Sequence, residues 1–300
     1  MHPEMLQLSP ICFGLLLCFT FSACLNSADD EEQDLQPPAI EAPSAATAVA
    51  PSHFLEVSAD ADFIPVAFSA TDEGGLSEII VEAHNGFDGH LHKSVNDFVL
   101  LTSRRTITQE DLTDPLRFET RADDEVGIYL DDRNPSVPNG GLVLAGPYHF
   151  SIKGADRGGN ETSYADNSTY HSTFYLHRHY APQVEVGAID RSSGSVSGRV
   201  WRNDEDAASG NIVFLWVYIV TPNPENPAEE GDLREEWLWG KSNWPHQYRA
   251  NTGDPLPSGD SIDLAELLTD QAAIRDMAPS DRLRFWAEDE NGNISVYTFE

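Results

Sequence analysis

From His53 to the C-terminus, short apolar runs alternate with clusters of turn-forming residues. The runs are rich in Val, Ile, Phe and Tyr, and clusters of Gly, Pro, Asn and Asp separate them. This spacing predicts antiparallel β-strands, and no long stretch has the 3.6-residue period of an amphipathic helix. Residues 265–276 are richer in Ala and Leu and predict a short helix. The expected fold class is therefore all-β.

The expected strands fall into two groups of similar size. The first group is 54–57, 64–70, 78–84, 98–102, 116–120, 146–153 and 172–177. The second group is 184–189, 195–201, 212–220, 236–239, 261–264, 283–288 and 294–299. Groups of about seven short strands predict two tandem Ig-like antiparallel β-sandwich domains. We place them at 53–181 and 182–300, because Pro182 suits the start of a strand.

Each predicted domain ends in a similar strand, turn and strand. The turn is Asp156-Arg-Gly-Gly-Asn160 in the first domain and Asp289-Glu-Asn-Gly-Asn293 in the second. Gly supplies the positive φ that a tight hairpin needs, so both turns predict hairpins in two modules of one type. The alternative is a Ca²⁺ site, because carboxylate oxygens suit a hard cation.

The first 52 residues have a different character. Residues 1–23 contain an apolar run of signal-peptide length, which ends in Phe-Ser-Ala before Cys24. Small residues before a Cys resemble the lipobox of bacterial lipoproteins, which implies cleavage before Cys24 and its lipidation. A cleaved secretory signal and a misassigned start are the alternatives. Residues 24–52 are first acidic and then rich in Pro and Ala, which predicts a disordered linker.

The acidic tetrad at 29–32 resembles the surface-export signal of some outer-membrane lipoproteins, the alternative being a plain acidic spacer. We therefore expect a bacterial outer-membrane protein that is lipid-anchored and faces the outside.

The three cysteines all lie within the first 24 residues, so the body has neither a disulfide nor a Cys ligand. The chain has 18 Lys and Arg against 50 Asp and Glu, a net charge of −32. Such a charge excludes nucleic acid and anionic lipid faces as partners.

Histidines from distant parts of the chain are expected at one pole of the first domain. If 78–84, 146–153 and 172–177 are the neighbouring C, F and G strands, then His84, His149, His177 and His179 converge. His90 and His92 follow the first of these strands directly. Imidazoles without Cys suit zinc or copper. We predict His84, His90, His92 and His149 as ligands, and His177, His179 or Asp88 could add to them. The alternative is a set of solvated polar loop residues.

A family resemblance supports this assignment. The stretch at 82–92, Glu-Ala-His-Asn-Gly-Phe-Asp-Gly-His-Leu-His, precedes a Gly-Pro-Tyr-His-Phe strand at 146–150. Together they resemble a family of Ig-like bacterial lipoprotein domains of unknown function with a His-Asn-x-Phe-Asp-x-His-x-His motif. The resemblance covers roughly 50–180 and implies a fold and a location but no reaction. This chain has no His between His92 and His149, where the family has a His-rich segment.

All six tryptophans lie in the second domain. Trp201, Trp216 and Trp286 fall within strand patterns and are expected in the core. For Trp237, Trp239 and Trp244, core packing and an exposed patch for a glycan or a surface protein both fit the pattern. No P-loop, nucleophile elbow or zinc-protease motif occurs. We therefore expect a non-enzymatic binding module that holds a metal ion. The alternative is a structural or glycan-adhesion module without a metal site.

Overall fold

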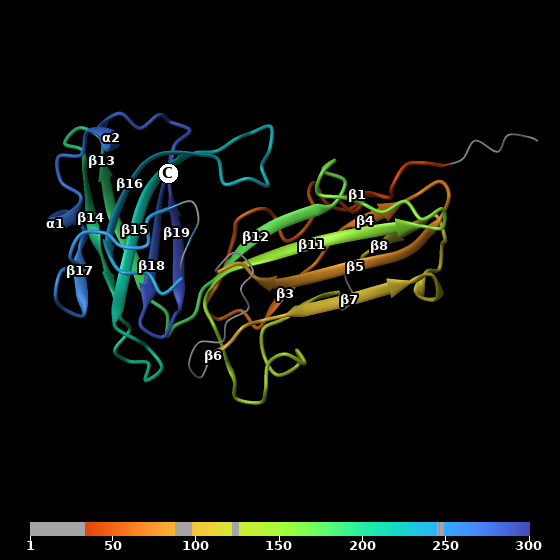
Figure 1. The fold of residues 1–300 in the computed structure, drawn as a ribbon, viewed down its shortest axis with the longest axis horizontal. Helices are drawn as coiled ribbons and strands as arrows, with labels where there is room; N and C mark the ends of the chain where they lie inside the picture. Colours follow the sequence, from red (N-terminus) through yellow and green to blue (C-terminus); the bar gives the residue numbers. More distant parts are fainter. Residues whose placement is uncertain (1–33, 88–97, 122–125, 245, 247–248) are drawn as a thin grey trace, which may run out of the picture. The chain divides into compact units, whose positions relative to one another are not determined.

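The computed structural model describes residues 34–87, 98–121, 126–244, 246 and 249–300. The chain divides into an N-terminal unit, Met1–Asp34, and a compact unit, Leu35–Glu300, which contains all the described strands (Figure 1). Within this described part, no helix has both the length and the apolar character that a membrane crossing requires. Residues 1–33 and 88–97 lie outside the described residues, and with them the predicted sites at Cys24, Asp88, His90 and His92.

The first sandwich packs a three-stranded sheet against a five-stranded sheet. The smaller sheet has the order β1 (Ala39–Glu41), β4 (Ser69–Thr71) and β8 (Arg117–Glu119). The larger has the order β2 (Leu55–Val57), β12 (Tyr170–Leu176), β11 (Gly146–Asp156), β5 (Leu76–Asn85) and β7 (Ser103–Thr108). Additional short elements are β3 (Phe63–Pro65) with β9 (Gly127–Tyr129), β6 (Phe98–Val99) with β10 (Leu142–Val143), and the 3₁₀ turn Gln109–Asp111. The predicted C, F and G strands are neighbours in the larger sheet.

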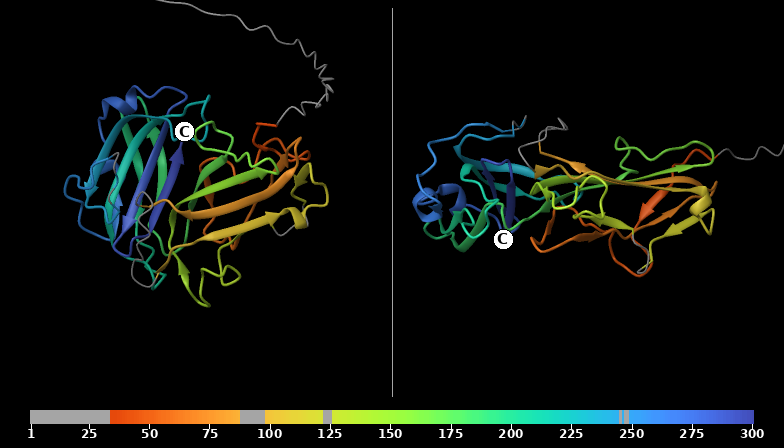
Figure 2. Two further views of the ribbon diagram at one scale, coloured as in Figure 1. Left: turned by 45° about the vertical axis from the view of Figure 1, so that its right-hand side comes forward. Right: turned by 90° about the horizontal axis from the view of Figure 1, so that it is seen from below.

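The second sandwich is built in the same way. One sheet has the order β13 (Gln183–Asp190), β14 (Ser195–Trp201) and β17 (Ser261–Asp263). The other has the order β16 (Asp232–Gly240), β15 (Ile212–Thr221), β18 (Arg282–Asp289) and β19 (Ile294–Phe299). The predicted short helix forms as two single turns, α1 (Leu264–Leu267) and α2 (Ala272–Arg275). Figure 2 shows both sandwiches from two further sides. The all-β class with two sandwiches is confirmed, and the pairing of their main sheets is antiparallel except where β2 joins β12 in parallel.

Apolar side chains at alternate positions form the cores. Along β5, burial alternates strictly from Ile79 to Asn85, so one face of the strand is buried and the other is only partly covered. Ile79 and Phe150 of the larger sheet and Phe68 next to the smaller one are at most 1% exposed. The partly covered face of β5 and β11 is where the histidines lie.

The first sandwich begins earlier than the predicted boundary at His53. Residues 39–41 form β1, which pairs with β4, and Ala50 pairs with Ala67. Pro38 packs closely on Gly154, where an added Cβ would lie 3.0 Å from the proline Cβ. The disordered linker predicted for 24–52 is therefore wrong for residues 38–52. Buried Pro38, Pro43 and Pro51 tie this segment to the sandwich, whereas Ala45, Ala46 and Ala48 are exposed.

The two sandwiches share one hydrophobic core cluster across residue 181. Phe87 of the first sandwich contacts Trp244 of the second, with ring centroids 5.0 Å apart. The Ile294 amide donates to the Ala145 carbonyl over 2.9 Å, and the Ala145 amide donates to Asn293 Oδ1 over 3.1 Å. Residues 181 and 182 thus connect two sandwiches within one compact unit.

The two predicted hairpin turns have the same structure. The Asn160 amide donates to Asp156 Oδ1 over 2.7 Å, and the Asn293 amide donates to Asp289 Oδ1 over 2.8 Å. In both turns the Asn side chain donates to the other carboxylate oxygen. Gly159 and Gly292 have φ of 89° and 90°, which favours glycine. Hydrogen bonds within each turn use both carboxylate oxygens, as expected of a hairpin.

Candidate functional site: a histidine pair on the first sandwich

His84 and His149 face each other on neighbouring strands. His84 lies near the end of β5, His149 near the start of β11, and the antiparallel register places them directly opposite. Both are half-buried, and their ring centroids are 5.7 Å apart at an interplanar angle of 46°. Gly86 makes room for this arrangement, because a Cβ there would lie 3.1 Å from the His149 ring. The structure thus brings together two of the four predicted ligands.

The separation of the two rings suits a shared metal ion. Two imidazoles bound to one tetrahedral Zn²⁺, with Zn–N bonds of about 2.0–2.1 Å, have ring centres about 5 Å apart. The 5.7 Å observed is close to this value, and small side-chain rotations cover the difference. Among the described residues, this pair belongs to no group of three or more possible ligands. Asp88, His90 and His92, which the sequence also suggests as ligands, lie outside the described part.

A charged network adjoins the pair on the same face of the sheet. Glu82 precedes His84 by two residues, and it accepts hydrogen bonds from Lys153, Ser151 and Arg104. Burial alone would raise the pKa of Glu82, but the hydrogen bond and positive charge of Lys153 hold that pKa below its usual value. Glu82 is therefore ionised at neutral pH.

A surface pocket opens beside His84. Its volume is about 530 Å³, and it is lined mainly by polar side chains: Glu82, His84, Thr102, Ser103, Arg104, Asn134 and Ser136. The walls are fixed, because the Thr102 amide donates to Ser136 Oγ and the Ser136 amide donates to Asn134 Oδ1. The pocket gives solvent and small solutes access to the His84 side of the pair.

The structure does not bring His177 and His179 to this pair. Thr173 lies opposite His149, and His177 is four residues further on, or roughly 13 Å along an extended chain. His177 is buried, with its ring 4.2 Å from that of Tyr297. His179 is exposed, and its Nε2 lies 2.7 Å from Asp60 Oδ1. The predicted convergence of four histidines therefore holds only for His84 and His149.

The tryptophan segment faces inward. Trp244 is 1% exposed, and its indole donates to the Gly292 carbonyl over 2.8 Å. Trp239 is 7% exposed within the core, and Trp237 is half-buried and donates to Gln271. The exposed patch considered for Trp237, Trp239 and Trp244 is thus wrong. The segment around Trp244 has the sequence of a loop, but its hydrogen-bond partners lie inside the domain. It therefore packs inward.

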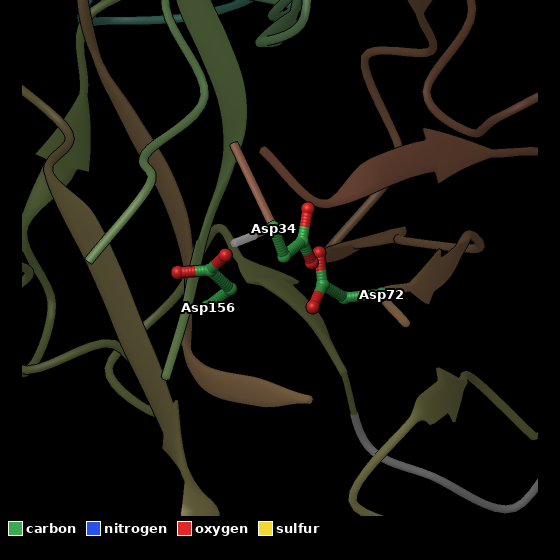
Figure 3. A group of neighbouring side chains, drawn as sticks. All are labelled: Asp34, Asp72 and Asp156. Atoms are coloured by element: carbon green, nitrogen blue, oxygen red, sulfur yellow. The ribbon is translucent and has the colours of Figure 1, made fainter. Parts of the chain in front are cut away.

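Two buried carboxylates meet elsewhere in the first sandwich (Figure 3). Asp72 follows β4 and Asp156 ends β11; ligand oxygens of the two lie within 4.8 Å of each other. Burial would raise the pKa of Asp156, but hydrogen bonds from Asn160 and the turn hold it below the usual value. Two carboxylates are far fewer than the six to eight oxygens that Ca²⁺ takes. Asp34, also labelled in Figure 3, is the last residue of the N-terminal unit.

Solved structures similar to this chain share little sequence with it. A tetra-tandem repeat in the extending region of a large adhesion protein is 14% identical, with a TM-score of 0.25, over 82% of this chain and 48% of that one. Dimeric latent PorU from Porphyromonas gingivalis is 13% identical, with a TM-score of 0.25, over 88% and 20%. Fibronectin(III)-like modules of Clostridium thermocellum CbhA are 11% identical, with a TM-score of 0.21, over 83% and 90%.

This chain thus spans about half of the adhesion-protein structure and a fifth of the PorU structure. The fold assignment rests on the strands described above. No curated protein matches the chain. Residues 24–169 match the model of one family, which is described as a domain of unknown function (DUF4625) and covers the first sandwich up to the start of β12.

Proposed function

We propose that this protein is a lipid-anchored, non-enzymatic binding module of the bacterial outer membrane, which holds a divalent transition metal on its first sandwich. The observation that carries the proposal is the cross-strand pair of His84 and His149, with ring centroids 5.7 Å apart. The proposed ion is zinc or copper, because imidazole ligands without Cys suit both.

The position of the pair favours metal binding over a solvated role. Both histidines lie on neighbouring strands that hold their backbones in place. Metal binding therefore costs little conformational entropy. The net charge of −32 raises the local concentration of cations. The open pocket beside His84 gives an ion a route of entry. His90 and His92 are proposed as further ligands from their place in the sequence, six and eight residues after His84.

Replacing both His84 and His149 by Ala should abolish tight metal binding. The loss should exceed the 10–100-fold that follows removal of groups that only orient a ligand, because two ligands disappear. The measurement is calorimetric titration of the purified protein with Zn²⁺ and Cu²⁺, together with metal analysis of the protein as isolated. His179→Ala is the matched control, because His179 is exposed and lies away from the pair.

Two results would contradict this proposal. One is that the wild-type protein takes up neither Zn²⁺ nor Cu²⁺. The other is a double variant that binds as tightly as the unchanged protein while remaining folded by circular dichroism.

The lipid anchor has its own test. Replacing Cys24 by Ala should move the protein from the membrane fraction to the soluble fraction, because the proposed lipidation site is lost. Cys18→Ala is the matched control, since Cys18 lies within the apolar run that would be removed. Immunoblots of separated membrane and soluble fractions measure the outcome. If Cys24→Ala stays in the membrane fraction like Cys18→Ala, Cys24 does not carry the anchor.

A further inference from the structure

Trp201 is the one tryptophan that contributes to neither hydrophobic core. All six tryptophans lie in the described part of the chain. Trp216, Trp244 and Trp286 belong to the core cluster shared by the two sandwiches, Trp239 belongs to the second cluster, and Trp237 packs against it. Trp201 is half-buried and absent from both clusters. The expectation that Trp201 is a core residue is therefore wrong.

The side chain of Trp201 lies on the outer face of the sheet formed by β13, β14 and β17. Its neighbour Val200 is fully buried, and alternation along the strand places Trp201 and Arg199 on the opposite face. The guanidinium of Arg199 lies 4.4 Å from the centre of the indole. In the register, Arg199 stands between Glu185 and Asp263. An aromatic ring and three charged groups thus share one solvent-facing surface.

A groove crosses this surface beside the aromatic ring. Its volume is about 360 Å³, and it is lined by Glu185, Gly187, Gly198, Arg199, Ser261 and Asp263. Two glycines keep the floor of the groove open. Gly198 has φ of 138°, and a Cβ there would lie 2.1 Å from the Glu185 carbonyl oxygen. A β-bulge between Val186 and Ala188 lies at the same point, so the backbone itself shapes the groove.

We propose that this groove and Trp201 form a binding site for a neutral saccharide. Carboxylates of Glu185 and Asp263 can accept hydrogen bonds from sugar hydroxyls, and Arg199 can donate to them. The indole offers an apolar face with negative charge density, which suits the C–H groups of a sugar ring. Arg199 now lies over this ring and forms an ion pair of 3.2 Å with Glu185. Because its side chain is 56% exposed, it can turn toward a bound hydroxyl.

The charge of the surface selects against acidic sugars. Two carboxylates flank one guanidinium in the groove, and the whole chain carries a charge of −32. An anionic saccharide would be repelled by both. This site lies on the second sandwich, apart from the histidine pair, so it stands independently of the proposed metal binding.

The test is binding of neutral hexasaccharides to the full chain. We would titrate cello-, malto-, xylo- and chito-oligosaccharides by calorimetry, and a sulfated oligosaccharide as the charged comparison. At least one neutral hexasaccharide should bind, and Trp201→Ala should weaken its binding about tenfold or more, because aromatic anchors dominate such contacts. Glu185→Gln should weaken it as well, since this variant keeps the shape of the side chain but loses its charge.

Trp237→Ala is the matched control, because it removes an indole outside the groove and should leave saccharide binding unchanged. Thermal unfolding of each variant checks that the fold is retained. Three outcomes overturn the proposal: no neutral hexasaccharide binds, only the sulfated one binds, or folded Trp201→Ala and Glu185→Gln bind as the unchanged chain does.

Discussion

Replacing Glu288 by Ala should lower the free energy of unfolding by about 3–5 kcal/mol. Glu288 and Arg249 form a salt bridge of 3.1 Å, and both side chains are 0% exposed. Removing one partner of such a pair leaves the other charge buried without compensation. The loss should therefore be far larger than the loss of about 1 kcal/mol or less expected for an exposed pair.

The partners of Glu288 show what the Ala variant would disrupt. Its carboxylate also accepts hydrogen bonds from Ser242 Oγ, the Asn243 amide and the Trp286 indole. Burial raises the pKa of Glu288, and the positive charge of Arg249 with these donors opposes the rise. Arg249 lies 4.6 Å from the centre of the Phe214 ring, within an aromatic surround. The carboxylate thus fixes the segment that carries Trp244.

Urea unfolding followed by circular dichroism measures the effect. A double replacement, Glu288→Met with Arg249→Leu, is the matched control, because well-packed apolar side chains can replace a buried ion pair at little cost. It should be markedly more stable than Glu288→Ala. An Ala variant that loses less than about 1 kcal/mol would show that the pair does not fix this segment.

Lowering the pH from 6.5 to 4 should destabilise the fold through His177. Burial lowers the pKa of His177 from 6.5 to about 4. The unfolded chain therefore binds more protons than the folded chain between these values, so stability falls as the pH falls. Above pH 6.5 the contribution of His177 is fully present, and below pH 4 it is lost. The total loss is about 3 kcal/mol, at 1.36 kcal/mol per pKa unit.

The surroundings of His177 place this effect at the contact between the sandwiches. Its ring meets Tyr297 of β19 edge-on, and its Nε2 lies 3.9 Å from Glu56 Oε2. Glu56 also accepts a hydrogen bond from the Thr298 amide. Burial raises the pKa of Glu56, which makes its own contribution to stability fall as the pH rises. The contributions of His177 and Glu56 to folding stability therefore change in opposite directions as the pH changes.

Comparing variants separates the two contributions. His177→Phe keeps an aromatic ring against Tyr297 and removes the titration, so its stability should change less between pH 6.5 and 4. His179→Asn, at an exposed position, is the control and should follow the unchanged chain. Urea unfolding at half-unit pH intervals gives the curves. If His177→Phe loses as much stability as the unchanged chain, His177 is not the responsible group.

Local patterns in the sequence were sufficient for most of the strands and for one pair of histidines, but they did not predict β1, β7 or β9. The alternation along β5 and β11 follows from their apolar positions, and the expected strand order places His84 against His149. The turns at Asp156 and Asp289 could also be predicted from the sequence, because glycine and asparagine occupy positions that a hairpin requires. In each case, the residues that decide the structure are close in sequence or follow from a common strand order.

Contacts between distant residues account for what the sequence did not reveal. Trp244 stands in a loop-like segment, and its burial depends on Gly292 and Glu288, more than 40 residues away. The strand pattern predicts Trp201 in the core. In the structure, a bulge and the glycines of β13 and β14 shape the solvent-facing surface on which Trp201 lies. The early start at β1 likewise depends on β4, some 30 residues further on.

The position of β7 at the edge of the five-stranded sheet affects the solubility of the protein. An edge strand exposes unpaired backbone groups and can template aggregation with another chain. β7 carries Arg104 and Arg105 at successive positions; both are exposed, and their side chains lie on opposite faces of the sheet. Two copies that approached through this edge would bring their arginine pairs toward each other over strands of six residues, with Arg104 of each copy ion-paired to its own Glu82. We expect the charge on this edge strand to disfavour edge-to-edge self-association of the long sheet.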